Sequence, residues 1–291
     1  MVRIGLRLPP GYLAGQWDAT HTPALGPAPA ALTELKQAGL QTVELNMMRG
    51  DVEPQVARQA MDTLAAAGLA MTVHGWLGPL PGTGDPEPTG DLVALCLHAR
   101  DHGGYPPLMV TIHSLASSVE PPCIMAPQTV QAIQGWLRFF AAQRFNVQLA
   151  LELNRANGAP RPGTSYTSLL EMVEEINHPG VGFCWDIGHS HWNCLHGKHP
   201  LKPPDTFTAK VIHTHIHDLG PSGATHYPLT LGNLPLMQYL NLLREARYNG
   251  ILSLELSPAR FTELGLDLKC GILESIAVLQ AARDMPIQAR P

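Results

Sequence analysis

Short apolar segments alternate with helix-period segments along almost the whole chain, and this alternation restricts the fold more than any other feature. Segments such as 54–68, 128–143 and 166–177 carry apolar residues three and four positions apart, as amphipathic helices do. Alternating strands and helices are typical of βαβ units, whose strands pair in parallel. The runs that read as strands are 2–8, 41–46, 70–75, 108–113, 147–153, 181–186, 210–217 and 251–257. Eight such units predict a single (β/α)8 TIM barrel over residues 1–291, in preference to an open sheet or two small domains.

Within these strands, alternating side chains can be assigned to the two faces of the barrel. In the strand 181–186, Phe183 and Trp185 share one face, whereas Cys184 and Asp186 share the other. The same alternation recurs along the chain, so we expect the apolar face to pack on the helices and the other face to point inward. The inward series of seven successive strands end on Glu44, His74, His113, Glu152, Asp186, His215 and Glu255, about 30–40 residues apart.

These seven ionisable side chains are predicted to meet at the C-terminal rim of the barrel, where barrel enzymes place their active sites. Burying such groups is costly unless a counter-charge or a metal ion compensates them. A shared cation would satisfy several at once; the alternative is an inward hydrogen-bonded polar network. The best ligand candidates are Glu152, Asp186, His215 and Glu255. Their oxygen and imidazole donors suit Mn²⁺, Mg²⁺, Co²⁺, Fe²⁺ or Zn²⁺.

A cation at this rim could support proton-transfer chemistry. It can chelate two neighbouring oxygens of a hydroxy-carbonyl compound and stabilise the negative charge of an enediolate. Glu152 and Glu255 are then candidates for the general acid/base residues that remove a carbon-bound proton and return one. His189 follows Asp186 by three residues and could bind either the metal or the substrate. With the additional histidines, the rim could instead hold two or three zinc ions that activate water against a phosphodiester. The Gly/Pro-rich segment 78–91 is expected to lie over the rim as a lid.

The composition of the chain indicates which classes of partner such a site is expected to have. The net charge is −5 and the 19 Lys and Arg residues are not clustered, so we expect no nucleic-acid partner. The five cysteines are far apart and odd in number, which favours free thiols in the cytoplasm. The N-terminal segment reads as a strand and not as a signal peptide, and we expect no membrane span. The sequence thus predicts a cytoplasmic enzyme acting on a small sugar-like molecule, and it leaves open assembly into a homo-oligomer.

Four short motifs, in order along the chain, resemble the xylose-isomerase-like TIM-barrel superfamily. AGLQTVELN resembles its second-strand pattern, WDIGHSH its sixth-strand Asp-x-x-His, HIHD its seventh-strand His-x-x-Asp, and LSLELSP its last-strand glutamate. That superfamily includes sugar isomerases and epimerases, dehydratases and apurinic-site endonucleases. The resemblance implies a metal-dependent isomerase or epimerase in carbohydrate metabolism. A lyase or dehydratase of the same superfamily and a multi-zinc endonuclease-like phosphodiesterase are the alternatives.

The resemblance to the sugar enzymes also implies roles for individual residues. It makes Glu152, Asp186, His215 and Glu255 the metal ligands. Glu152 and Glu255 would form the proton-transfer pair, and His189 would contact the substrate.

The endonuclease branch implies a wider metal centre. There, His74 and His113 would add a second metal, and His189 and His226 would help bind a third. The chain departs from that branch at Ala224, where the family has an aspartate, and loop 220–233 has no arginine where many epimerases have one. Two further candidates for metal or substrate contacts, from their inward parity, are Glu44 and His217.

Overall fold

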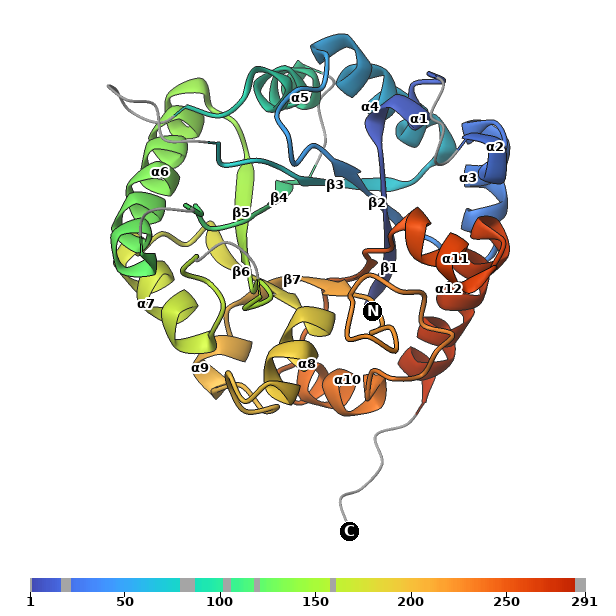
Figure 1. The fold of residues 1–291 in the computed structure, drawn as a ribbon. Helices are drawn as coiled ribbons and strands as arrows, with labels where there is room; N and C mark the ends of the chain where they lie inside the picture. Colours follow the sequence, from blue (N-terminus) through green and yellow to red (C-terminus); the bar gives the residue numbers. More distant parts are fainter. Residues whose placement is uncertain are drawn as a thin grey trace.

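Eight parallel strands close into a barrel in sequence order, and helices surround it (Figure 1). The computed structural model describes residues 2–16, 22–78, 87–101, 106–117, 121–157 and 161–285, so most of the expected lid lies outside the described residues. The strands are β1 (Arg3–Leu8), β2 (Thr42–Asn46), β3 (Ala70–His74), β4 (Leu108–Ile112), β5 (Val147–Glu152), β6 (Val181–Asp186), β7 (Val211–Ile216) and β8 (Ile251–Leu254). The predicted (β/α)8 barrel is confirmed, with each strand within a few residues of its predicted bounds.

The helices predicted from segments 54–68, 128–143 and 166–177 are present together with others, and one of these three is longer than its sequence pattern indicated. They are α1 (Pro10–Leu13), α2 (Thr22–Leu25), α3 (Ala28–Gln37), α4 (Pro54–Ala67), α5 (Gly90–Asp101), α6 (Pro122–Gln143), α7 (Tyr166–Ile176), α8 (Ile187–Leu195), α9 (Asp205–Thr208), α10 (Leu236–Glu245), α11 (Pro258–Leu264) and α12 (Leu268–Asp284). Helix α6 continues through Pro127, because burial of Met125 and Val130 on either side offsets the hydrogen bond that the proline cannot donate. None of the described helices combines the length and apolarity that crossing a membrane requires.

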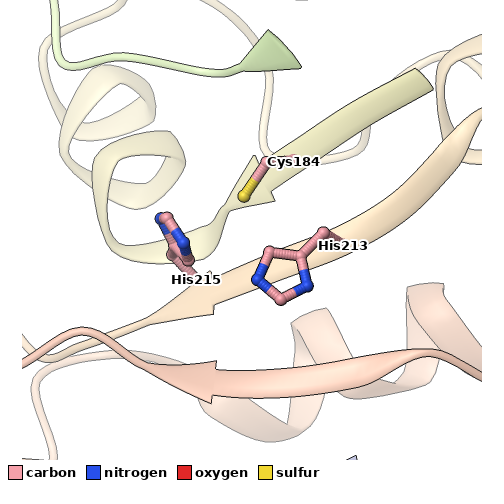
Figure 2. Close-up of side chains that lie close together, drawn as sticks. All are labelled: Cys184, His213 and His215. Carbon is pink, nitrogen blue, oxygen red and sulfur yellow. The ribbon is translucent and has the colours of Figure 1, made fainter. Parts of the chain in front are cut away.

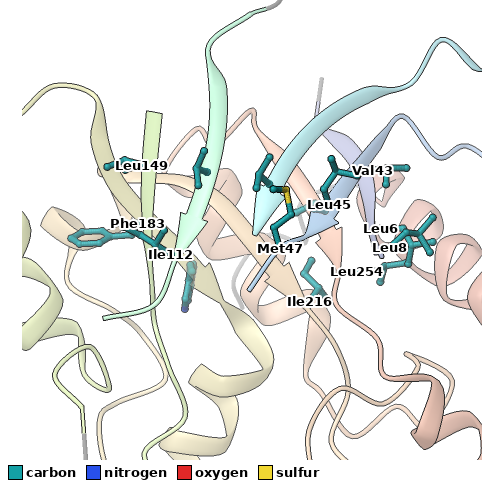
Figure 3. Close-up of a cluster of buried hydrophobic side chains, with 14 of the residues drawn as sticks. Leu6, Leu8, Val43, Leu45, Met47, Ile112, Leu149, Phe183, Ile216 and Leu254 are labelled. Atoms are coloured by element: carbon teal, nitrogen blue, oxygen red, sulfur yellow. The ribbon is translucent and has the colours of Figure 1, made fainter. Parts of the chain in front are cut away.

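The apolar faces of the strands pack against the helix ring, as their alternation predicted. Phe183 of β6 stacks on Phe207 of α9 with 4.5 Å between ring centroids, and Trp185 meets Tyr239 of α10 edge-on at 5.6 Å. Figure 3 shows side chains of this buried layer on several neighbouring strands. Because these residues fix the outward face, the alternate residues of each strand must point into the barrel.

The pairing of β6 with β7 sets the position of two residues at the rim. The register shifts between Phe183 and Cys184, and beyond this irregularity Asp186 lies opposite His215. Gly182 makes the close approach possible, since a Cβ atom there would lie 2.5 Å from the carbonyl oxygen of Lys210. A side chain at this position would therefore press on the backbone of β7.

We expect Gly182→Ala to lower the free energy of unfolding by roughly 1–3 kcal/mol, because the Lys210 carbonyl is backbone and cannot rotate away. Gly90→Ala is the matched control, since a Cβ at Gly90, the first residue of α5, meets nothing within 4 Å. Urea denaturation followed by circular dichroism compares the two variants with wild type. Wild-type stability of Gly182→Ala would contradict this account of the β6–β7 contact.

Candidate metal centre at the barrel rim

Four donor atoms from four strand ends converge at the C-terminal rim of the barrel. From Nδ1 of His215, Oε2 of Glu152 lies at 3.2 Å, Oδ2 of Asp186 at 3.9 Å and Oε2 of Glu255 at 3.1 Å. All four side chains are buried, and one donor atom of each lies within 4.8 Å of the others. Within the described part of the chain, none of these four atoms has a hydrogen-bond partner. The structure thus brings together the four residues that the sequence selected as metal-ligand candidates.

Each carboxylate at this centre uses one oxygen for structure and leaves the other directed inward. Oδ1 of Asp186 accepts the backbone N–H of His189, the third residue of α8, at 2.7 Å, as a helix cap does. Oε1 of Glu152 accepts from Nδ2 of Asn154 at 3.4 Å, and Oε1 of Glu255 accepts from the guanidinium of Arg7. The unused oxygens are the three that face His215. These contacts hold the carboxylates in place and leave the inward lone pairs free.

Glu44 of β2 orients His215 from the side away from the centre. Both oxygens of Glu44 lie 3.0 Å from Nε2 of His215, and Ser253 donates to the same carboxylate at 2.9 Å. Burial raises the pKa of Glu44, but the positive charges of His215 and His213 outweigh it and hold that pKa well below its ordinary value. An ionised Glu44 keeps the proton of His215 on Nε2, so Nδ1 presents its lone pair to the centre whenever the ring is neutral. The sequence placed Glu44 among metal or substrate contacts; in the structure it contacts the ring of a candidate ligand.

The charges of the centre act strongly on one another. Burial raises the pKa values of Glu152 and Glu255, but neighbouring cationic groups outweigh it and hold both pKa values well below their ordinary range. For Glu152 these groups are His113 and His215. For Glu255 they are Arg7 and His215. Burial lowers the pKa of His215, whereas the carboxylates of Glu44, Glu255 and Glu152 raise it well above the ordinary value. At neutral pH the protein alone therefore holds ionised glutamates around a protonated imidazole.

His74 and His113 form a second candidate group with Glu152 on one side of the centre. Nε2 of His74 and Nε2 of His113 lie 3.3 and 3.2 Å from Oε2 of Glu152. His74 is fully buried and both of its ring nitrogens lack hydrogen-bond partners among the described residues, whereas His113 is partly exposed. These two strand-end histidines thus share a carboxylate oxygen with the central four.

His189, His217 and His226 form a third candidate group on the opposite side of Asp186. Their donor atoms lie within 4.8 Å of one another, and Nε2 of His217 is 3.1 Å from Oδ1 of Asp186. His226 has a positive φ of 67°, and its backbone N–H donates to Nδ1 of His217 at 3.0 Å. The ring of His217 fits against Gly188, where a Cβ would lie 2.0 Å from the imidazole. The absence of a side chain at Gly188 therefore allows the ring of His217 to lie next to His189 and His226.

A thiol lies below the centre, inside the barrel. Figure 2 shows Cys184 on β6 beside His213 and His215 on β7, and donor atoms of the three lie within 4.8 Å of one another. Burial raises the pKa of the Cys184 thiol far above its ordinary value, so it is a neutral thiol here. The alternation of β6 placed this residue inward, but no sequence pattern grouped it with two histidines.

Sequence reasoning missed three polar residues around the centre. Arg7 has the inward parity of β1 and pairs in register with Glu44, so the alternation rule could have found it. Asn154 and Arg161 lie beyond the end of β5, where strand alternation carries no signal. The guanidinium of Arg161 donates to Oδ1 of Asn154, which in turn contacts Glu152.

A cavity of about 440 Å³ opens beside this centre, on the β3–β4 side of the rim. His113 belongs both to its wall and to the second candidate group. The rest of the wall combines apolar side chains with a few polar ones: Met48, Trp76, Leu77, Ser114, Leu115, Ala116, Ser117, Met125, Gln128 and Arg161, with Gly75 and Gly78. A small molecule reaching the candidate metal centre can therefore extend into this cavity.

Known proteins share both the fold and a sequence pattern with this chain. It is 29% identical over 121 residues to the uncharacterized protein MJ1311 of Methanocaldococcus jannaschii, a match that spans 39% of this chain and only 38% of that protein. The structure of an L-ribulose 3-epimerase matches with a TM-score of 0.63 at 17% identity, covering 98% of this chain and 95% of the other. A D-allulose 3-epimerase from Methylomonas sp., in complex with D-allulose, matches with a TM-score of 0.62 at 15% identity, covering 97% and 98%.

Residues 32–282 match the family model described as a xylose isomerase-like TIM barrel. This match covers all strands of the barrel except β1, and with them every residue of the four-atom centre. The chain belongs to the xylose isomerase-like TIM-barrel family.

Proposed function

We propose that the protein is a divalent-metal-dependent isomerase or epimerase of a sugar or a related hydroxy-carbonyl compound. The observation that carries this proposal is the convergence of four buried donor atoms without hydrogen-bond partners in the described residues, one each from Glu152, Asp186, His215 and Glu255. Unpaired buried polar atoms are costly, and a cation is the group that would satisfy all four together. The likeness in fold to two ketose 3-epimerases supports the same class of reaction.

The donor set fits a divalent cation of hard or borderline character. Three carboxylate oxygens and one imidazole nitrogen would hold it, which suits Mn²⁺, Mg²⁺, Co²⁺, Fe²⁺ or Zn²⁺. The bound ion would supply Lewis acidity toward the carbonyl oxygen of the substrate. Glu44 and Arg7 would fix His215 and Glu255 in the binding orientation from outside the set.

Glu152 and Glu255 are the proposed general acid/base pair. Both are ionised at neutral pH because neighbouring cationic side chains lower their pKa values, so each can accept a proton. His74 lies between them, with its nitrogens 3.3 Å from Glu152 and 3.8 Å from Glu255. A carbon next to the substrate carbonyl could lose its proton to one ionised glutamate and regain one from the other after that glutamate has taken up a solvent proton. His189, at 3.5 Å from Oε1 of Glu152, would contact a substrate hydroxyl at the same place.

A second candidate function is hydrolysis of a phosphodiester by a centre with several zinc ions. The observation in its favour is that the His74–His113 and His189–His217–His226 groups flank the four-atom centre. The net charge of −5 argues against a DNA substrate, because phosphate contacts need clustered positive charge. The number of tightly bound metal ions per chain separates the two candidates.

We expect the purified protein to bind one divalent cation tightly, and Asp186→Asn and His215→Ala to lose it while staying folded. Asn keeps the oxygen that caps α8 but removes the charge that the cation needs. The exposed His178→Ala is the control and should keep full metal content. Elemental analysis measures the metal content of each variant, and circular dichroism checks that it is folded. Full metal content in both variants would refute the ligand assignment, and three ions per wild-type chain would favour the phosphodiesterase.

Binding of Mn²⁺ to the metal-free protein should release about one proton at pH 7. The raised pKa of His215 means that its imidazole is protonated there, whereas the glutamates are already ionised. Protons therefore compete with the cation below the pKa of His215 in the folded protein, and affinity should rise with pH until that pKa is passed. Calorimetric titration in two buffers of different ionisation enthalpy measures the release. Heats that do not depend on the buffer would contradict a protonated His215.

We expect Glu152→Gln and Glu255→Gln each to reduce turnover about 10²- to 10⁴-fold, because Gln keeps the shape but cannot accept a proton. Turnover of a ketose in D₂O should place deuterium on the carbon next to the carbonyl, which NMR detects. Glu174→Gln, an exposed change on α7, is the control, and metal content is checked because both glutamates are also proposed ligands. Turnover without deuterium incorporation, unaffected by either replacement, would exclude this mechanism.

A further inference from the structure

We propose that Arg161 forms an anion-binding subsite, and that the substrate therefore carries a carboxylate or phosphate group away from its reacting carbon. This inference rests on the proposed function, since it concerns the substrate of the same centre. It differs from a neutral ketose of the kind bound in the D-allulose complex. The site is the cavity beside the metal centre, between His113 and Arg161.

Arg161 is a partly buried cation that has no acidic partner among the described residues. No carboxylate lies within ion-pair distance of its guanidinium in the described residues, and its one hydrogen bond there goes to the neutral amide of Asn154. A guanidinium has five N–H donors in a planar fork, so most of them are free for a ligand. Because Arg161 is partly buried, its charge has lost part of its hydration, and this lowers its pKa. Such a group favours an oxyanion that can accept two hydrogen bonds at once.

The nearest negative charge is already assigned to the metal centre. Glu152 is linked to Arg161 through Asn154, whose amide donates toward Oε1 of Glu152 while its oxygen accepts from Arg161. Glu152 is also the acidic group that raises the pKa of Arg161 against the effect of burial. A divalent cation at the centre would take up the charge of Glu152 and leave Arg161 without compensation. A ligand anion is then the group that restores the balance.

The cavity wall fits a molecule with a carbon skeleton and a polar end. Trp76 and Leu115 offer apolar surface, while Ser114 and Gln128 add polar groups. The hydroxyl oxygen of Ser114 is buried and has no hydrogen-bond partner among the described residues. If its side chain turns toward the cavity, this hydroxyl adds a second donor on the same wall as the guanidinium of Arg161, and an oxyanion can accept from both. The wall therefore matches an extended hydroxy-carbonyl compound with a terminal anionic group.

The test uses full-length, Mn²⁺-loaded protein and small probes, so it does not depend on knowing the substrate. Methyl phosphate and acetate are the two anionic probes, with trimethyl phosphate and acetamide as their neutral counterparts. Isothermal titration measures each on wild type, Arg161→Gln and Arg161→Lys. Arg155→Gln is the matched control, because Arg155 lies at the same rim over the ring of Trp192 and does not line the cavity.

Wild type should bind at least one anion roughly tenfold or more tightly than its neutral counterpart. Arg161→Gln should abolish that preference with unchanged Mn²⁺ content, and Arg161→Lys should restore only part of it, since an ammonium lacks the fork. Arg155→Gln should change affinity less than about threefold, because a screened charge outside the cavity contributes little. Preference for methyl phosphate alone identifies a phosphate monoester, and preference for acetate alone a carboxylate.

Absence of any preference for an anion in wild type, or equal anion binding by wild type and Arg161→Gln, would overturn the proposal. These outcomes are distinct from failure of the proposed function. Anion binding that depends on Arg161, in a protein that exchanges no carbon-bound proton with D₂O, would keep the subsite and reject the isomerase. Exchange of a carbon-bound proton of a neutral ketose with D₂O, together with no preference for an anion, would keep the isomerase and reject the subsite.

Discussion

The burial of four acidic side chains inside one barrel is the constraint on which the rest of the site depends. Glu44, Glu152, Asp186 and Glu255 are all almost fully shielded from solvent. Their charges are tolerable only because cationic groups lie among them, above all His215, which contacts all four. In the protein alone the counter-charge is a protonated imidazole. Exchange of that proton for a divalent cation would add one positive charge against the four carboxylates, so the buried charges that the protonated imidazole compensates in the folded chain are also those that would attract a metal.

The barrel supplies the geometry that this balance needs. Parallel strands end at one rim, and the register of β6 with β7 sets Asp186 beside His215. The absence of a side chain at Gly182 leaves room for the backbone of Lys210 just before β7, and the cap on α8 holds one oxygen of Asp186. Each carboxylate at the centre is held by one oxygen and free at the other. Preorganisation of this kind removes the cost of arranging the groups when a ligand binds.

The sequence predicted those parts of the site that follow from local periodicity. Strand alternation has period two, so it assigned Glu152, Asp186 and His215 to the inward face without knowledge of distant contacts. Glu255, one residue past β8, keeps the same phase. Features set by packing between distant segments were beyond it: the contact of His217 with Gly188, the thiol of Cys184 against two histidines, and Arg161 in a loop. The short helices α1, α2 and α9 could not be predicted for the same reason, because a single helical turn is stable only through tertiary contacts.

Glu152 would have a different role in each of the two candidate functions. Its Oε2 faces His215 of the four-atom centre at 3.2 Å and also His113 at 3.2 Å. A cation held by His74 and His113 would draw on this same oxygen, and Glu152 would then bridge two ions. A carboxylate shared in this way has a lower affinity for protons and serves poorly as a base toward carbon. A second ion on the flanking histidine group would therefore weaken Glu152 as a base, whereas without that ion the partly exposed His113 would be free to contact a substrate in the cavity.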